Sequence, residues 1–284
     1  MVLYEFQLRY TEGGRVLKQR LISAGILLAI VLTCVFVSDT TRVLFFGAAG
    51  ILCSYEYSRA MEKMDVYCAA WVMYVYIAVQ AALTLMHAGA LRYIACFTGG
   101  VYLAMFSGIV HKKVSGNGAI YTVAGLAYPG FLFGVLMMIS VGDIWLQSLA
   151  IGALSTWACD TAALLGGTKF GKHKLAPLVS PNKSIEGAVF GAAAAVLVGF
   201  LIGVLKLFPE IPVWVCVVTA LVASTLGQIG DLAESLLKRM IGTKDFSDLI
   251  PGHGGMMDRA DSLLFSIPSA YFCLIAADHI WHFL

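Results

Sequence analysis

Long apolar runs constrain the fold of this chain more than any other feature. Of its 284 residues, 60% are hydrophobic and only 13% are charged. Soluble domains are usually about half apolar and a quarter charged, so a soluble fold would lack the polar groups to cover its surface. About 20 apolar residues in a helix cross the roughly 30 Å of hydrocarbon in a bilayer. The sequence therefore predicts an all-α, polytopic integral membrane protein.

Nine segments are apolar enough to be candidate transmembrane helices. They are residues 21–37, 43–58, 66–86, 91–110, 118–140, 144–165, 186–207, 213–236 and 262–283. The second is the weakest, because it is short and carries Glu56 near its end, and a re-entrant or tilted helix is the alternative there. Most connections are short, but two polar loops stand apart, at residues 166–185 and 237–261.

The basic residues indicate the orientation of these helices. If the N-terminus is cytoplasmic, 16 of the 19 Lys and Arg residues fall on the cytoplasmic side, and only Arg42, Arg92 and Lys206 fall on the other. The positive-inside rule predicts such a split for a correct helix count. We therefore expect a multi-pass protein of a bacterial-type inner membrane, with both polar loops in the cytoplasm. The net charge of +2 gives no reason to expect nucleic acid as a partner.

The polar chemistry is concentrated in the C-terminal half. Residues 1–140 are mostly apolar and are expected to form a scaffold, whereas residues 141–284 carry both polar loops and are expected to form the catalytic region. All seven cysteines lie within apolar stretches, and no two form a CxxC pair. This pattern argues against a zinc site or a disulfide framework.

Five carboxylates lie inside or at the ends of apolar segments. A charged side chain at mid-bilayer costs about 3 kcal/mol, so such residues are candidates for function. Carboxylates at one depth repel each other unless cations bind between them, and oxygen ligands favour Mg²⁺, Mn²⁺ or Ca²⁺ over zinc. The candidate metal ligands are Asp160, Asp231, Glu234, Asp258 and Asp261, with Asp231 and Asp258 as first choices.

Structural roles are the alternative for these acids. Glu234 lies four residues before Lys238, the spacing of a helical ion pair. Asp258 and Asp261 lie where the last helix begins, where acids complement the helix dipole.

The first loop combines lysines with glycines. It lies within GGTKFGKHKLAPLVSPNKSIEGAVFG, residues 166–191. Glycine lets the backbone approach a phosphate closely, and lysine supplies the opposite charge. The order GxxxxGK[ST] of a Walker A loop is absent. A basic loop that only contacts anionic lipid is the alternative.

The second loop mixes cations, carboxylates and a histidine. It lies within SLLKRMIGTKDFSDLIPGHGGMMDRAD, residues 235–261. Cations for phosphates and carboxylates for a metal suit phosphoryl or nucleotidyl transfer. His253 lies in a glycine-rich segment, where a loop histidine without a catalytic role is the alternative.

These two loops resemble the signatures of the phosphatidate cytidylyltransferase (CDP-diglyceride synthase) family. In the second loop the matching residues are Ser235, Lys238-Arg239, Lys244-Asp245, Ser247, Ile250-Pro251, His253-Gly254-Gly255, Asp258-Arg259 and Asp261. Ala260 stands where the family usually has a larger apolar residue or Thr. In and before the first loop they are Asp160, Phe170-Gly171-Lys172 and the run from Ser180 to Gly187, where Asn182 replaces a usual Lys. The close match covers residues 155–265.

The resemblance implies a reaction of CTP with phosphatidic acid that gives CDP-diacylglycerol and pyrophosphate. It implies Mg²⁺ as cofactor, with room for a second cation, membrane lipid as a partner, and a homodimer. We assign catalytic roles to Asp231, Asp258, His253, Lys238 and Arg239. We assign substrate or phosphate binding to Lys172, Lys183, Ser180, Lys244 and Arg259.

Two other functions compete with this assignment. A CTP-dependent kinase of a polyprenol-type lipid would phosphorylate a hydroxyl and release CDP. An ion-coupled transporter would use the acids as an ion path, but its acids would lie near the midplane between repeats. Here they lie toward one face, beside the basic loops.

Overall fold

A computed structural model describes residues 32–243, 245–247, 249 and 254–283 of the chain. Most of them are helical, with the bounds α2 (Asp39–Glu62), α3 (Ala70–Leu85), α4 (Ala90–Val110), α5 (Gly116–Gly125), α6 (Leu132–Ser140), α7 (Trp145–Phe170), α8 (Ile185–Val204), α9 (Val213–Ile241), α10 (Met257–Ala260) and α11 (Leu263–Trp281). A π-helical segment, η1 (Leu126–Phe131), joins α5 to α6. Strands β1 (Lys174–Ala176) and β2 (Ser180–Ser184) pair antiparallel as a hairpin between α7 and α8.

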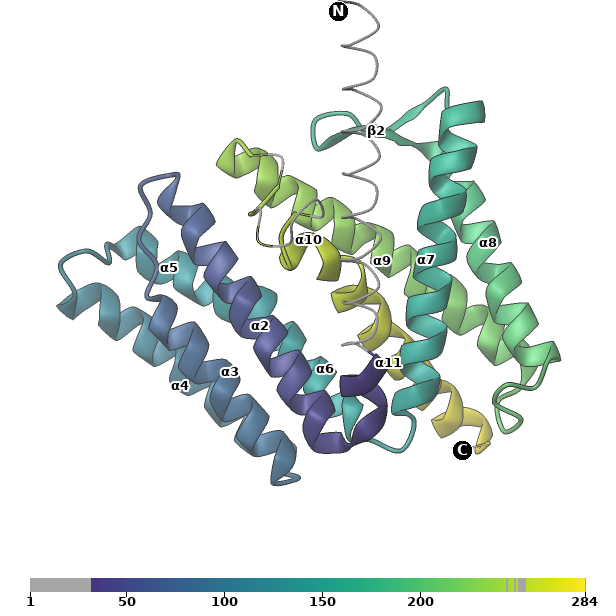
Figure 1. Cartoon of the computed structure of the whole chain (residues 1–284), viewed down its shortest axis with the longest axis horizontal. Coiled ribbons are helices and arrows are strands. Elements are labelled where there is room, and N and C mark those ends of the chain that lie inside the picture. The colour runs from purple at the N-terminus through teal and green to yellow at the C-terminus, as the bar shows by residue number, and fades with distance from the viewer. Residues whose placement is uncertain (1–31, 244, 248, 250–253, 284) are drawn as a thin grey trace, which may run out of the picture.

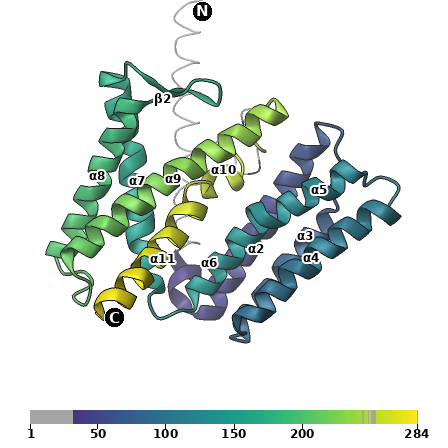
Figure 2. The same ribbon diagram turned by 180° about the vertical axis from the view of Figure 1, so that it is seen from behind.

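The helices form two groups that share a core. Figures 1 and 2 show α2 to α6 side by side in one group and α7, α8, α9 and α11 in the other. The larger cluster of buried side chains joins the groups, because Met257, Leu264 and Ile267 pack with residues of α2, α3 and α6. The hairpin and α10 lie at one end of the bundle, and the α6–α7 turn lies at the opposite end (Figure 1).

Six helices of the described chain are long and apolar enough to cross a membrane. They are α4, α5 with α6, α7, α8, α9 and α10 with α11. The chain is thus a mostly helical, multi-pass membrane protein, as expected, although the hairpin adds two strands that an all-α fold does not include. The predicted first span, 21–37, lies mostly outside the described residues, so the count of nine stays a prediction.

Both polar loops begin later in the chain than the sequence predicts, because the helices before them are longer. α7 runs to Phe170 and α9 to Ile241, so Lys238 and Arg239 lie on the last turns of α9 and not in a loop. Basic residues favour helical structure near a helix C-terminus, and their long side chains reach water from an apolar segment. α9 ends where Gly242 takes a left-handed conformation with φ 78°, which glycine adopts without strain.

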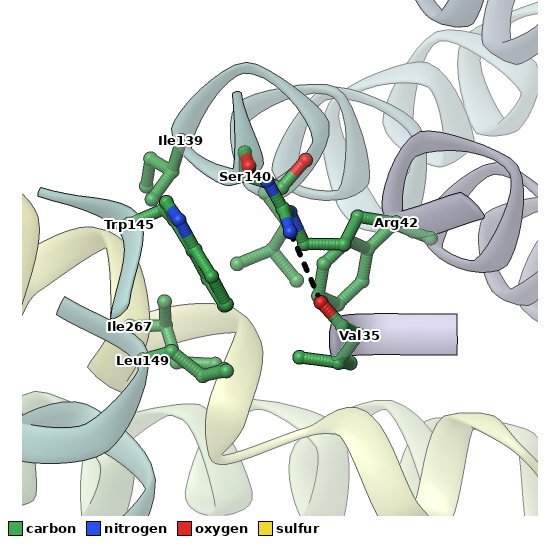
Figure 3. Close-up of a pocket in the computed structure, with 9 residues that line it drawn as sticks. Val35, Arg42, Ile139, Ser140, Trp145, Leu149 and Ile267 are labelled. Carbon is green, nitrogen blue, oxygen red and sulfur yellow. Dashed lines mark hydrogen bonds between the residues drawn. The ribbon is translucent and has the colours of Figure 1, made fainter. Parts of the chain in front are cut away.

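Arg42 joins the two groups of helices at the end opposite the hairpin. Its Nε donates to the Ser140 carbonyl at 2.7 Å, and its Nη1 donates to the Val35 carbonyl at 3.1 Å. The guanidinium lies beside the Trp145 ring (Figure 3), 3.9 Å from the ring centre, and also pairs with Asp39. The start of α2 is thereby fixed to the end of α6 and the start of α7.

Glycines on α8 allow close contact with α9. A Cβ at Gly199 would lie 2.6 Å from the Cys216 carbonyl oxygen and 2.8 Å from the Ala220 Cβ. Small residues let helix backbones approach where no hydrophobic effect drives their association in lipid. The close approach of α8 to the first half of α9 therefore depends on this glycine.

Gly199→Ala should lower the thermal unfolding midpoint in detergent, because the added methyl group must push α8 and α9 apart. Overpacking of this kind costs about 1–3 kcal/mol. Gly99→Ala is the matched control, since Gly99 is also helical but a methyl group there would have no neighbouring atom within 4 Å. That control should be neutral or stabilising by up to about 1 kcal/mol. Equal midpoints for both variants would contradict the close α8–α9 packing.

Candidate functional site

Three of the predicted acids meet between α9 and the start of α11. Asp231, Glu234 and Asp261 each place a carboxylate oxygen within 4.8 Å of the other two. Asp231 and Glu234 share a face of α9 because they are three residues apart, and Asp261 joins them from the turn between α10 and α11. Glu234 is fully buried, whereas the other two are partly accessible.

Lys238 bridges this cluster to Asp258. Its Nζ lies 2.6 Å from Glu234 Oε2 and 2.9 Å from Asp258 Oδ1. The Lys238 side chain is 13% exposed, Asp258 6% and Glu234 0%, so all three charges are largely removed from water. The predicted helical pair between Glu234 and Lys238 is therefore present, but as part of a buried network and not as a surface ion pair.

The hairpin brings a second lysine to the acids. Lys183 on β2 pairs with Asp231 on α9. Ser184 ends the strand and accepts a hydrogen bond from the Gly187 N–H at 3.1 Å, which starts α8. Glu186 fixes the other end of the loop, because it accepts from the N–H groups of Lys172 and His173 at 3.1 and 3.2 Å. These local bonds hold Lys183 beside Asp231 of α9.

A cavity of about 490 Å³ lies beside this ion pair. Asp160 on α7, Lys183 and Asp231 line it together, with glycines and small residues of α7 and α8 around them. Lys174, another lysine of the first loop, also lines this cavity, as does Gln228, which the sequence did not indicate. Cations, acids and an apolar wall from Leu164 and Leu175 make the cavity suited to an amphipathic or phosphorylated ligand.

The other predicted residues take different positions. Lys172 is exposed between α7 and β1, and Ser180 begins β2 opposite Ala176. Arg239 donates from Nε to the Val179 carbonyl at 3.1 Å, which ties the hairpin turn to α9. Arg259 lies exposed on α10. His253 and Lys244 lie outside the described residues, so their roles stay predictions.

The acidic cluster fits a divalent cation. Within the described part of the chain, Oε1 of Glu234 is buried and has no hydrogen-bond partner. An unsatisfied buried carboxylate oxygen is costly unless a cation or donor reaches it. Three carboxylates offer only oxygen atoms as metal ligands, which suits a hard cation such as Mg²⁺. Asp258, a first choice from the sequence, lies outside this group of three and binds Lys238 instead.

Comparison with known proteins identifies the family of this chain. The model of the cytidylyltransferase family matches residues 18–276. The chain belongs to this family. It is 35% identical over 250 residues to the phosphatidate cytidylyltransferases of Brucella suis biovar 1 and Brucella melitensis biotype 1, covering 87% of this chain and 89% of each relative. It is also 34% identical over 173 residues to that of Staphylococcus saprophyticus, covering 61% of this chain and 65% of the relative. The resemblance seen in the two loops is thus confirmed.

Lys238→Met should destabilise the protein strongly, because it leaves the buried carboxylates of Glu234 and Asp258 without their shared cation. Removing one partner of a buried pair costs about 3–5 kcal/mol. Adding Asp258→Asn should recover part of the loss, since it removes one of the uncompensated charges. Thermal unfolding in detergent measures both effects.

Lys172→Met is the control for this prediction, because it removes an exposed lysine near the same end of the bundle. Its unfolding midpoint should match that of the parent protein. A Lys238→Met variant as stable as Lys172→Met would show that the buried network does not stabilise the fold.

Proposed function

We propose that this chain is a phosphatidate cytidylyltransferase. A phosphate oxygen of phosphatidic acid attacks the α-phosphorus of CTP, the bond from that phosphorus to the β-phosphate oxygen breaks, and pyrophosphate leaves with the electron pair. The products are CDP-diacylglycerol and pyrophosphate. The names of the relatives support the substrates, and the joined set of acids and lysines at one end of the bundle supports the chemistry.

The observation that carries the proposal is the position of Lys183. It reaches from the hairpin to Asp231. Asp231 belongs to the group of three carboxylates and also lines the cavity. Both substrates are polyanions, so the site must supply positive charge to bring their phosphates together. Lys183 and Lys174 supply it from the hairpin strands that line the cavity.

The acids have a separate task in this proposal. Asp231, Glu234 and Asp261 would hold Mg²⁺, and Asp160 lines the same cavity as Asp231. The bound ion would stabilise negative charge on the transferring and leaving phosphates. No strong protein base is required, because a phosphate oxygen is already a competent nucleophile near neutral pH. Lys238 holds Glu234 and Asp258 in place and keeps their charges balanced.

The orientation is also part of the proposal. The hairpin, the end of α9 and α10 share one end of the bundle (Figure 1), and these elements carry Lys174, Lys183, Lys238, Arg239 and Arg259. By the positive-inside rule this end faces the cytoplasm, where CTP is available. The nine-helix count, a bacterial-type inner membrane and a homodimer stay predictions.

The assay that tests the function supplies purified protein with CTP, Mg²⁺ and phosphatidic acid. We expect equal amounts of CDP-lipid and pyrophosphate. A phosphorylated lipid with CDP would indicate the lipid kinase instead, and no product with unchanged CTP would favour a transporter. EDTA should abolish the activity, and Mg²⁺ should restore it where Zn²⁺ does not.

Asp231→Asn should lower kcat by about 100-fold or more, the scale on which one electrostatic contact to the transition state is lost. Asp261→Asn should have a comparable effect, because both residues belong to the group of three carboxylates. Asp143→Asn, at the opposite end of the bundle, is the control and should keep full activity. Full activity of both Asp231→Asn and Asp261→Asn would place the metal elsewhere.

The orientation has its own test, in a chain whose seven cysteines are replaced by alanine. Ser115→Cys precedes α5, and Asp143→Cys precedes α7 at the other end of that hydrophobic span. An impermeant maleimide added to intact cells should label Asp143→Cys only, and Ser115→Cys should react only after the membrane is opened. Labelling of both from one side would contradict the proposed orientation.

A further inference from the structure

Glu56 is a buried acid in the part of the chain expected to be scaffold. It lies on α2 with 1% of its surface exposed. Its carboxylate accepts hydrogen bonds from Ser247 Oγ at 2.5 Å, from the Met256 N–H at 2.9 Å and from the Met257 N–H at 2.8 Å. All three donors belong to the second polar loop and the start of α10, about 200 residues further along the chain.

Asp258 holds the same segment from another direction. Its Oδ2 accepts from the Gly255 N–H at 2.9 Å and from the Phe246 N–H at 3.2 Å. Gly255 therefore lies between two carboxylates. A Cβ at this position would lie 2.9 Å from Asp258 Oδ2 and 2.9 Å from both carboxylate oxygens of Glu56. Only glycine leaves room for both acids to reach the backbone of this turn.

The contacts of Glu56 are of a kind that fixes backbone. A charged acceptor makes shorter and stronger hydrogen bonds than a neutral one, and two of its donors are main-chain N–H groups. Within the described residues no Lys, Arg or His nitrogen lies within 4 Å of this carboxylate, so its charge depends on these donors. Loss of the carboxylate would release Met256 and Met257, which come directly before Asp258 in the chain.

We propose that Glu56 is a positioning residue for the transfer reaction. It fixes the turn from Gly254 to Met257 to α2, and thereby sets the place of Asp258 beside Lys238 and of Asp261 beside Asp231 and Glu234. The cavity is lined by residues of α7, α8, α9 and the hairpin, and neither Glu56 nor any of the three residues that donate to it is among them. Glu56 therefore acts on the acids and not on the nucleotide contacts. The inference rests on the proposed function for its kinetic test only.

Glu56→Gln is the decisive variant. An amide can replace only one of the two oxygens, so either Met256 or Met257 loses its acceptor while the volume stays unchanged. We expect kcat, per mole of folded protein, to fall at least tenfold, and KM for CTP to change less than threefold. Glu62→Gln, six residues further along α2 and paired with Arg59 at the surface, is the matched control and should keep the kinetics of the parent.

Ser247→Ala provides a second variant that keeps both backbone bonds of Glu56. It should lower kcat less than Glu56→Gln does, and the double variant should lose less than the product of the two single losses, because both act through one contact. If Glu56→Gln does not fold, Ser247→Ala decides alone. A kcat within twofold of the parent for folded Glu56→Gln, or for Ser247→Ala in that case, would overturn the proposal.

A measurement without substrate separates this proposal from the proposed function. Leu249→Cys, in the chain without native cysteines, places an exposed thiol in the segment next to Ser247. Its reaction with a soluble maleimide should be at least threefold faster when Glu56→Gln is added, and unchanged when Glu62→Gln is added. A parent protein that makes no CDP-lipid would overturn the proposed function alone. Equal maleimide rates in all three backgrounds would overturn the positioning role alone.

Discussion

Burial of carboxylates within an apolar bundle is the constraint on which the rest of the structure depends. A charged group removed from water is tolerated only where donors or counter-ions replace its hydration. Lys238 does this for Glu234 and Asp258, and backbone N–H groups do it for Glu56. Lys238 reaches Asp258, 20 residues further along the chain, and the backbone donors to Glu56 lie about 200 residues from it. Satisfying the charges therefore also fixes α2, α9 and α10 relative to one another.

The same constraint explains how the lysines of the site are used. Lys238 contacts Glu234 and Asp258 at once, and Lys183 on the hairpin pairs with Asp231. Glu234 still keeps one oxygen without a partner among the described residues. The acids of the site are thus balanced only in part by the protein. That remaining negative charge is what makes the group of three carboxylates suited to a cation, while Asp258 is already occupied by its lysine.

The fold was predictable to the extent that it follows from hydrophobicity. Runs such as 91–110 and 186–207 correspond closely to α4 and α8, because a bilayer-length apolar segment has no alternative to a helix. The ends of helices were less predictable. The apolar pattern stops near Leu236, yet α9 continues to Ile241, because Lys238 finds acids to pair with inside the protein. The hairpin was not expected, because its two short strands differ from a loop only in their hydrogen bonds to each other.

The candidate site shows a sharper division between what spacing indicates and what only packing reveals. Asp231 and Glu234 are three residues apart on one helix, so their common face follows from the sequence alone. In the sequence, by contrast, Glu56 is only a residue that weakens an apolar span. Its partners lie beyond residue 246, and no local pattern connects them. An isolated acid in an apolar helix nevertheless costs free energy on insertion, so such an acid is a candidate for a role elsewhere in the protein. The physical question for such a residue is therefore which backbone it holds, and here that backbone leads directly into Asp258 and Asp261 of the candidate site.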